Sequence, residues 1–312
     1  MPILALADNS IAGISSHRHC AITWNRFCAK HPAAWFWHTT AFLDYLAVRA
    51  ENYSFLYVDD EMRTQAIVPL VFRDGKEVDG YPLPCPLFND SAENLTEIKH
   101  ICRDHAEKIL KEHRCSPWRV RFSPLVNDYA SPCYFLPGED TTHESVVIDL
   151  GEPRDIRWTN LRKSNKGLIN KAKRHFTFHV HPEDWQENFR LMHLCERGQT
   201  RPTATWDELN HWVESGQAEV FGVKSGDYWI GFELANVYKN SLYNAILTTT
   251  ERDITSYMLW EISELYAQQG FSHFEIGWYG VATTKKEQAI EMFRKGMGGT
   301  LKSWKTTLLY DL

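Results

Sequence analysis

The chain has 312 residues, which is enough for two domains of ordinary size and a substantial core. Its formal net charge is −6 and 24% of its residues are charged, a normal balance that does not indicate a general electrostatic affinity for nucleic acid. No apolar run reaches membrane-spanning length, residues 1–13 lack the features of a signal peptide, and the seven cysteines form no Cys-x-x-Cys pair. We therefore expect a cytoplasmic protein with no disulfide framework and no metal site.

The first half of the chain predicts helices, a hairpin and an interrupted extended segment. Two helical stretches are broken by Pro32, and prolines interrupt the extended segment because proline cannot continue a central ladder. A helix is then expected to start at residue 89, and a strand follows it. In chain order these elements lie at residues 20–49, 54–57 with 65–72, 77–88, 89–109 and 118–125.

The second half predicts a similar order of elements, although no residue-level repeat is visible. A basic helix, a short strand, two helices and a hairpin lead into a strand–turn–helix–strand unit, which a helix and a last strand follow. These elements lie at residues 160–174, 177–180, 184–197, 206–215, 219–224 with 228–238, 242–278, 287–295 and 300–310. A boundary is expected after a strand at residues 143–150, which predicts two domains, residues 1–150 and 151–312.

The unit at residues 242–278 contains the most informative pattern. Residues 242–250 are apolar and rich in threonine, Asp253 is placed to cap a following helix, and Gly270 ends that helix. Free N–H groups at residues 252–256 then point the same way as the helix dipole, an arrangement that favours phosphate. No Walker lysine motif or Gly-x-Gly-x-x-Gly occurs, so neither a nucleoside triphosphate nor a dinucleotide is the first hypothesis. The alternative is an ordinary α/β unit that binds nothing.

This order of elements, present twice, resembles the GNAT (Gcn5-related N-acetyltransferase) fold in tandem. Local runs are similar to the Fem-type branch of that superfamily, which includes aminoacyl transferases of peptidoglycan bridges and shorter CoA-using acyltransferases of sugar pathways. The runs are residues 161–164 with 172–174, residues 254–265 with Gly270 and residues 274–277, and residues 293–299. The resemblance covers the second half well and the first half loosely. It implies an α/β (α+β) fold of two tandem GNAT-like domains, each with a mixed central sheet flanked by helices.

Two features depart from the GNAT pattern. The phosphate loop of that fold usually reads Arg/Gln-x-x-Gly-x-Gly/Ala, whereas residues 252–257 contain no glycine. Many GNAT enzymes also have a tyrosine acid in the helix after the last central strand, and residues 284–296 contain no tyrosine. The second role is therefore not carried over to this chain.

The resemblance implies a site for acyl-CoA as co-substrate in the second half. In GNAT-like enzymes the strand before the phosphate loop separates from its neighbour, and the pantetheine lies in the gap. Its amides pair with the strand, backbone N–H groups hold the thioester carbonyl as it becomes an oxyanion, and the pyrophosphate sits on the loop. The residues placed here are Ile246, Thr248, Thr249, Thr250, Arg252, Asp253, Ile254, Thr255, Ser256 and Lys285.

The implied reaction is attack of an amine on the thioester within one ternary complex, which needs a group that takes a proton. The candidates are Glu233, Tyr243, Asn244 and, in the first half, Asp90. Strand alternation puts Glu233 on the opposite face from its apolar neighbours. If that face is the cleft, burial raises the pKa of Glu233 into a useful range, and if it faces solvent, Glu233 is a surface carboxylate. A site without a side-chain base stays open.

Aromatic, polar and basic residues are candidates for binding the acceptor. Aromatic rings stack on a pyrimidine or sugar, amides and carboxylates bond a base edge or an amine, and cations pair with a pyrophosphate. The candidates are Trp37, Phe88, Asn89, Asp90, Arg162, Lys163, Lys166, Trp278, Tyr279, Arg294 and Lys295. The alternative is a set of core aromatics and a solvated basic helix.

Three functions are consistent with these patterns. The first is a CoA-dependent N-acyltransferase for a nucleotide-linked (dTDP or UDP) amino sugar in surface polysaccharide (lipopolysaccharide or O-antigen) assembly. The second is a Fem-type aminoacyl-tRNA-dependent transferase, because residues 157–182 carry seven lysines and arginines and no acid. The third is a non-catalytic GNAT-like binding module. The absence of a long helical-hairpin insertion and of a wider basic stretch favours CoA and small-molecule substrates. The oligomeric state is not predicted.

Overall fold

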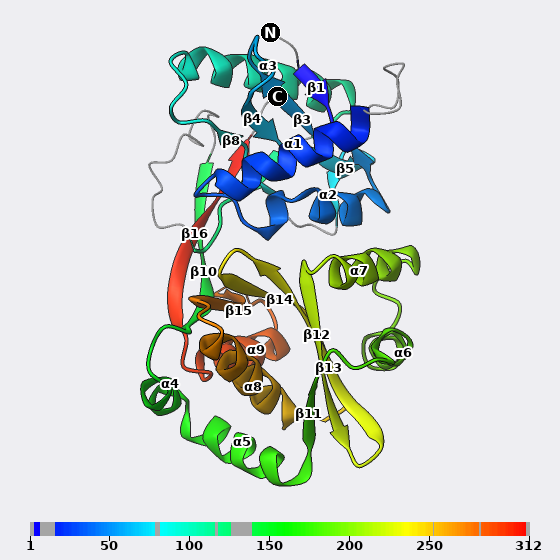
Figure 1. Ribbon diagram of the computed structural model, residues 1–312, viewed down its shortest axis with the longest axis vertical. Coiled ribbons are helices and arrows are strands. Elements are labelled where there is room, and N and C mark those ends of the chain that lie inside the picture. Colours follow the sequence, from blue (N-terminus) through cyan, green and yellow to red (C-terminus); the bar gives the residue numbers. More distant parts are fainter. Residues whose placement is uncertain are drawn as a thin grey trace. The chain divides into compact units, whose positions relative to one another are not determined.

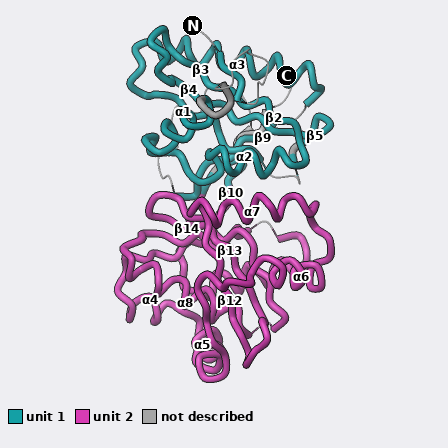
Figure 2. The backbone as a smooth tube through the Cα atoms, turned by 45° about the vertical axis from the view of Figure 1, so that its right-hand side comes forward, with its two compact units in different colours: residues 1–142, 304–312 teal, residues 143–303 magenta. Residues whose placement is uncertain are grey.

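The computed structural model describes residues 3–6, 16–78, 82–115, 118–125, 139–251, 253–280 and 282–309. The chain forms two compact units, residues 1–142 with 304–312 and residues 143–303 (Figure 2). Two strands, β10 (Glu139–Asp149) and β16 (Thr300–Leu309), pass from one unit into the other. This division differs from the expected one, because most of β10 belongs to unit 2 and the end of β16 returns to unit 1.

Unit 1 combines helices with small sheets (Figure 1). Its elements are α1 (Ser16–Lys30), η1 (Phe36–His38), α2 (Thr40–Ala47), α3 (Leu95–Glu112), β1 (Ile3–Ala5), β2 (Glu51–Asn52), β3 (Phe55–Val58), β4 (Thr64–Val68), β5 (Val71–Arg73), β6 (Lys76–Glu77), β7 (Leu83–Pro84), β8 (Leu87–Phe88) and β9 (Trp118–Arg121). An antiparallel sheet has the order β1-β3-β4-β8, and α1 and α3 pack against β4. A second sheet has the order β2-β5-β6, while β9 pairs with β7 and with the end of β16.

Helix α3 begins later than the sequence pattern predicts. The expected start at residue 89 is a turn, because the backbone N–H of Ala92 donates to the Asn89 carbonyl and the N–H of Leu95 donates to that of Ala92. The Asn89 side chain accepts a hydrogen bond from the Ser91 N–H, which favours a local turn over a helix. From Leu95 onward the predicted apolar face is present, and Ile98 is buried within it.

Unit 2 is a mixed sheet with helices on both faces. Its elements are α4 (Arg154–Asn160), α5 (Lys163–His175), α6 (Trp185–Arg197), α7 (Ala204–Glu214), α8 (Ile254–Gln268), α9 (Lys285–Lys295), β11 (Thr177–Val180), β12 (Ala218–Ser225), β13 (Tyr228–Tyr238), β14 (Ser241–Thr249) and β15 (His273–Tyr279). The strand order is β11-β12-β13-β14-β15-β10. Only β14 and β15 among these neighbours run parallel. The predicted α/β class is therefore confirmed.

The two faces of this sheet have different cores. One face packs on α5 and α8, where apolar residues of both helices meet those of β12 to β14 in one buried cluster. The other face packs on α6 and α7, where the Phe189 ring stacks on Phe232 of β13 at 5.3 Å between centroids. Because side chains alternate along a strand, each residue of β13 and β14 can be assigned to one of these faces.

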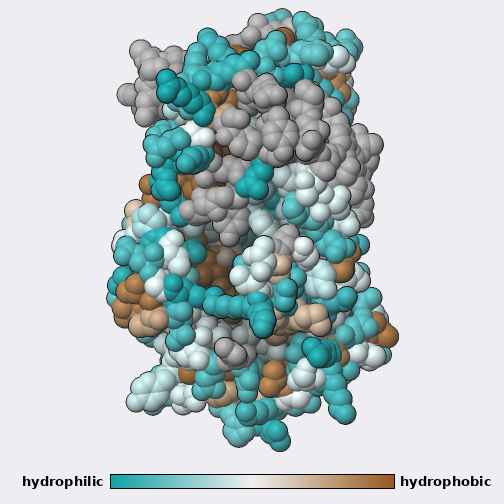
Figure 3. Space-filling model, turned by 180° about the vertical axis from the view of Figure 1, so that it is seen from behind, coloured by the Kyte–Doolittle hydropathy of each residue, from teal (hydrophilic) through white to brown (hydrophobic). Residues whose placement is uncertain are grey.

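The described surface carries apolar side chains in separate places. Seen from behind, the surface is mostly hydrophilic, with small apolar patches (Figure 3). The exposed large apolar residues of unit 2 lie on several different elements, namely Ile156, Val180, Leu191, Leu194, Tyr228 and Met292. None of the helices in the described ranges has both the length and the apolar character that crossing a bilayer requires.

Candidate functional site

Strands β14 and β15 separate part of the way along their length. They pair in parallel only from Ser241 to Tyr243, opposite residues 273–275. Beyond this point β14 stays paired with β13 as far as Thr249, and β15 stays paired with β10 as far as Tyr279. The β15-facing edge of β14 therefore has no strand partner after Tyr243 in the described part of the sheet. This is the separation that the GNAT resemblance implies.

A β-bulge lies where β14 leaves β15. Leu234 pairs with Ile246 and the next residue, Ala235, pairs with Asn244, so Ala245 is an extra residue on β14. A bulge of this kind bends its strand and increases the local twist. The bulge thus coincides with the start of the separated stretch and gives a local reason for it.

Glu233 lies on the face of β13 that α8 covers. A side chain added at Gly231, two residues away on the same face, would meet Ile254 and Met258 of α8. The Glu233 carboxyl is fully buried, and burial raises its pKa to about 8, so it is protonated at neutral pH. Of the two expectations for Glu233, the solvent-facing one is wrong.

The structure brings Glu233 and Asn244 together. The Nδ2 atom of Asn244 donates to Oε1 of Glu233 at 3.2 Å across the β13–β14 pair. The other oxygen, Oε2, is buried and has no hydrogen-bond partner among the described residues. The pair therefore places an acid with one unsatisfied oxygen beside the bulge. Two of the predicted catalytic residues are thus in contact.

Tyr243, Ile246 and Thr248 of β14 lie on the opposite face. Tyr243 is buried and pairs across the strand with Asn236, and Ile246 is also buried. Thr248 is fully buried, and its hydroxyl contacts Nδ1 of His193 on α6 at 3.0 Å. Thr249 is half-buried on the α8 face, beside Gly231, and Thr250, just beyond β14, is exposed with its hydroxyl bonded to the Ile230 carbonyl. His193 was not among the predicted site residues, and its only signal in the sequence was its place four residues after Phe189 on the apolar face of the predicted helix.

The start of α8 carries no side-chain cap. Asp253 occupies the N-cap position, but its carboxylate makes no capping bond. It pairs instead with the Nζ atom of Lys171 on α5 at 3.2 Å, so the expected capping role is wrong. Ile254 is in the core, and Thr255 is half-buried. The predicted phosphate ligand Arg252 lies outside the described residues.

Ser256, in the first turn of α8, is fully buried, and its hydroxyl has no partner among the described residues. This hydroxyl and the uncapped start leave hydrogen-bonding groups of the first turn without side-chain partners. They suit the phosphate-binding role that the resemblance implies for this segment.

Helix α9 starts in the opposite way. Oε2 of Glu287 accepts hydrogen bonds from the backbone N–H and hydroxyl groups of Thr283 and Thr284, at 2.8 to 3.0 Å. The backbone bonds from Thr283 and Thr284 lower the pKa of Glu287 to about 2. The start of α9 is therefore occupied by its own carboxylate, and Lys285 beside it is exposed. The start of α8 has no such side-chain cap, and in this it matches α4 to α7 and differs from α9.

The acceptor candidates of unit 1 make contacts within that unit. Trp37 is half-buried between Trp35 and Phe42, and the Arg121 guanidinium lies 4.2 Å from its ring centre. Phe88 is fully buried, so the expectation that its ring stacks on a ligand is wrong. Asp90 is exposed in the turn after β8 and belongs to unit 1, whereas the other catalytic candidates belong to unit 2.

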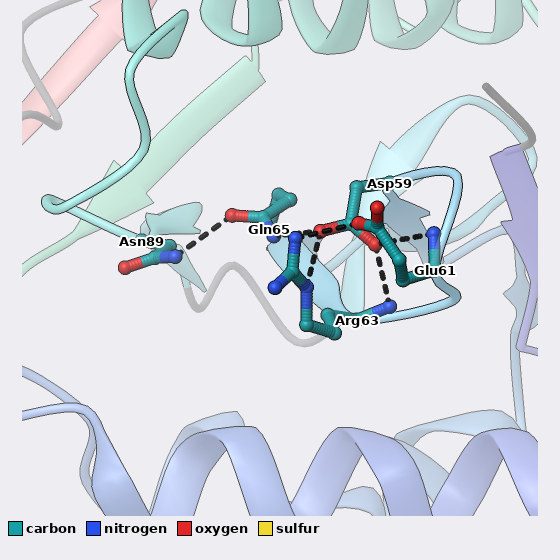
Figure 4. A network of polar contacts seen from close by, with 5 residues as sticks. All are labelled: Asp59, Glu61, Arg63, Gln65 and Asn89. Carbon is teal, nitrogen blue, oxygen red and sulfur yellow. Dashed lines mark hydrogen bonds and ion pairs between the residues drawn. The ribbon is translucent and has the colours of Figure 1, made fainter.

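Asn89 is the end of a polar network in unit 1 (Figure 4). Its Nδ2 atom donates to Gln65 at 2.7 Å, and Gln65 donates to Asp59. Asp59 also accepts from the backbone and side chain of Arg63, and these bonds lower its pKa although burial acts in the opposite direction. The network fixes the β3–β4 turn to the end of β8, and it gives Asn89 a structural role.

The acceptor candidates of unit 2 lie on α5, β15 and α9. Arg162, Lys163 and Lys295 are exposed, Lys166 donates to the Thr159 carbonyl, and Trp278 and Tyr279 are half-buried beyond the end of the β14–β15 pairing. Arg294 donates to the Trp278 carbonyl at 2.8 Å, and Lys295 lies 5.4 Å from the Tyr279 ring centre. Arg294 of α9 thus contacts Trp278, and Lys295 contacts Tyr279.

The basic stretch that suggested a tRNA footprint is partly neutralised. Arg157 is buried and pairs with Glu264 at 2.9 Å. Lys171 pairs with Asp253 as described above, and Lys173 pairs with Glu261 at 2.7 Å. Three of its cations are therefore bound to acids at the start of α8 or within it. In the described ranges, no group of three or more His, Cys, Asp or Glu side chains has metal-binding geometry.

Comparison with known proteins identifies the fold. No protein-family model matches the chain, and no curated protein matches it. Among solved structures, FemX is 12% identical, covers 91% of this chain and 95% of its own, and superposes with a TM-score of 0.62. L-PGS from Bacillus licheniformis is 13% identical, covers 86% of this chain and 87% of its own, and superposes with a TM-score of 0.57. A tandem GNAT protein from the clavulanic acid biosynthesis pathway is 10% identical, covers 98% of this chain and 97% of its own, and has a TM-score of 0.56. The chain therefore has a tandem GNAT-like fold.

Proposed function

We propose that this protein is an N-acyltransferase that moves an acyl group from acyl-CoA to an amine. The observation that carries the proposal is the separation of β14 from β15 beside the uncapped start of α8. A free strand edge pairs with the amides of an extended ligand, and a helix start holds its phosphates. The similarity to FemX and to a tandem GNAT protein supports the same class of chemistry.

The residues of unit 2 have defined tasks in this proposal. An amine nitrogen attacks the thioester carbonyl, the C–N bond forms, the C–S bond breaks and the nitrogen loses a proton. Backbone N–H groups on the free edge of β14 stabilise the negative charge that develops on the carbonyl oxygen. The first turn of α8, with Thr255 and Ser256, holds the phosphates, and Lys171 is the adjacent cation. The gain in rate comes mainly from holding the amine and the thioester close together in the orientation that the reaction requires.

Glu233 is the proposed proton acceptor. Its carboxyl has a pKa of about 8 and one unsatisfied oxygen, and it contacts Asn244 at the bulge. A base with a pKa near the working pH combines a useful ionised fraction with a useful proton affinity. We therefore expect turnover to rise with pH towards about 8, and we expect Glu233→Gln to slow turnover and remove this rise. A variant with the wild-type rate and pH profile would exclude Glu233 as the base.

For the acceptor we propose the amine of a nucleotide-linked (dTDP or UDP) amino sugar, used in the assembly of a surface polysaccharide. Trp278 and Tyr279 are half-buried on β15 beyond the pairing with β14, where an aromatic face can stack on a base or sugar. Lys295, next to the Tyr279 ring, supplies positive charge for a diphosphate.

A Fem-type aminoacyl-tRNA-dependent transferase is the second candidate. The observation in its favour is the exposed pair Arg162 and Lys163 at the start of α5, together with the similarity to FemX over 91% of the chain. Under this proposal the acyl group is an aminoacyl ester on RNA and the acceptor is a cell-wall precursor. The same strand edge and oxyanion contacts would serve both reactions.

Thermal stability with added ligands tests these proposals. We would measure the melting temperature of the purified protein with CoA, acetyl-CoA, dTDP, UDP and bulk tRNA, because a ligand that binds the native state raises it by mass action. Stabilisation by CoA and one pyrimidine diphosphate is expected. Stabilisation by tRNA without CoA would favour the second candidate. Stabilisation by CoA without transfer to any amine would show a binding module, and no stabilisation by any of the five ligands would contradict both transferases.

A further inference from the structure

His193 connects three parts of unit 2 that lie apart in the sequence. It is on α6, the residue is 7% exposed, and its ring packs edge-on against Trp206 of α7. Its Nδ1 atom lies 3.0 Å from the Thr248 hydroxyl on β14, and its Nε2 atom lies 2.8 Å from the Thr200 hydroxyl between α6 and α7. We call these three residues the His193 bridge.

Both partners of the imidazole lie at positions that matter for the site. Thr248 is fully buried in the stretch of β14 that has no partner on its β15 side, where the donor is proposed to lie. Thr200 is exposed in the connection at residues 198–203, which joins the two helices covering this face of the sheet. The bridge therefore ties a surface loop to the open stretch of the proposed donor strand.

The two hydrogen bonds of the bridge run in opposite directions at the imidazole. Burial and the nearby charges of Arg201 and Arg197 lower the pKa of His193 to about 4, so the ring is neutral at neutral pH. In a neutral imidazole one nitrogen donates and the other accepts. One threonine hydroxyl therefore accepts from the ring while the other donates to it. A neutral ring with both nitrogens occupied suits positioning better than proton transfer.

We propose that His193 is a positioning residue that holds the 198–203 loop against the open stretch of β14 and so keeps Thr248 in place for acyl transfer. This inference rests on the proposed function, because it assigns the bridge to that same strand edge. It predicts that loss of the bridge loosens the loop and lowers kcat, while the affinity for CoA changes little, because the phosphate contacts at the start of α8 and the backbone groups of β14 are left in place.

Isosteric variants separate the two halves of the bridge. Thr248→Val and Thr200→Val each remove one hydroxyl and keep the side-chain shape. His193→Asn places an amide near the Nδ1 position, and His193→Gln places one near the Nε2 position. His211→Asn, at an exposed histidine on α7, is the matched control. Hydrogen exchange of residues 198–203, kcat and the Kd for CoA are measured on the full chain.

Faster exchange in residues 198–203 is expected for Thr200→Val and His193→Asn, with smaller changes for His193→Gln. For Thr248→Val we expect a loss of about tenfold or more in kcat and a Kd for CoA within about twofold, because small displacements of a substrate-positioning group are costly. Unchanged exchange in both Thr200→Val and His193→Asn would overturn the bridge. Faster exchange with an unchanged kcat would overturn its role in turnover. A wild-type protein without transfer activity would contradict the proposed function, and the exchange data would still test the bridge.

Discussion

A buried carboxyl that is protonated at neutral pH makes stability depend on pH. The pKa of Glu233 is about 8 in the folded chain, against an ordinary value of 4.5. Between these values the unfolded chain loses the proton and the folded chain keeps it, so the folded state binds more protons. The free energy of unfolding therefore falls as pH rises from about 5 to 8, by up to about 1.4 kcal/mol for each pH unit from this group.

Glu233→Gln should remove this dependence. Glutamine mimics the neutral carboxyl, and its carbonyl oxygen still accepts from Asn244. We expect the stability of the variant relative to wild type to increase from pH 5 to pH 8 in urea unfolding. Parallel curves for the two proteins over that range would contradict the raised pKa.

Gly277 is required by its own backbone and by Arg294. Its φ is +116°, and an added Cβ would lie 2.5 Å from the Arg294 guanidinium carbon. Gly277→Ala should therefore destabilise the protein by about 1–3 kcal/mol, through backbone strain and displacement of Arg294. Gly167→Ala on α5 is the control, because its added Cβ meets nothing within 4 Å and it should be neutral or slightly stabilising. Equal stability of the two variants in urea unfolding would contradict the packing of Arg294 on Gly277.

At the scale of elements, the periodicity of the sequence predicted the helices and strands of unit 2 well. The predicted 242–250 strand is β14 with its bounds shifted by one residue, and Gly270 does follow α8 with a φ of +83°. The local pattern could not show that Asp253 turns towards Lys171, because that partner lies on a different helix. Nor could it show that Thr248 meets His193, a contact made across two elements. The arrangement of the candidate site depends on contacts between elements, and the periodicity of the sequence carries no information about such contacts.

The start of α8 gives a prediction about charge. The Asp253 carboxylate lies at the N-terminus of α8, which is proposed to hold phosphates. It forms an ion pair with the ammonium group of Lys171. Asp253→Asn removes the negative charge, keeps the side-chain size and frees that ammonium. We therefore expect CoA to bind about three- to tenfold more tightly, since charge near a helix terminus contributes about 0.3–1 kcal/mol and the freed cation adds to it. Isothermal titration calorimetry measures the change.

Glu261→Gln is a matched control for Asp253→Asn. It makes the same change of charge on α8, at the acid that pairs with Lys173 on α5. Its position lies two turns beyond the helix start, outside the reach of the terminal partial charges. We expect its CoA affinity to stay within about twofold of wild type. Equal effects of the two variants, or weaker binding by Asp253→Asn, would place the phosphates elsewhere.

At the scale of the whole molecule, the order of elements along the chain did not indicate that the C-terminal strand belongs partly to unit 1. The sequence pattern placed all of residues 151–312 in one domain, because the boundary was expected after the strand at residues 143–150. The structure pairs the end of β16 with β9, with Thr306 opposite Arg121. Within unit 1, Trp304 of β16 then packs on the Arg121 guanidinium at 4.2 Å. Such long-range pairing leaves no local signal, so the expected domain boundary could not anticipate it.

Charge over the whole chain separates the two candidate donors. The net charge is −6, and ion pairs occupy three cations of the basic stretch at residues 157–182. A tRNA site with six to ten phosphate contacts would lose about 10³–10⁵ in affinity between 50 and 200 mM salt. We expect the Kd for CoA to change far less, by under about tenfold, because few phosphates are held. Fluorescence titration at several salt concentrations measures both ligands.

The double variant Arg162→Gln with Lys163→Gln identifies where any tRNA binds. These two exposed cations at the start of α5 are candidates for RNA contacts, and they lie apart from the start of α8 in the sequence. If the donor is CoA, its affinity and salt dependence should match those of wild type. If the donor is an aminoacyl-tRNA, the double variant should bind RNA more weakly, and the slope of log K against log salt should become shallower by about one to two. A steep dependence of log K on log salt for tRNA binding to wild type, together with a shallower one for the variant, would favour aminoacyl-tRNA over CoA as the donor.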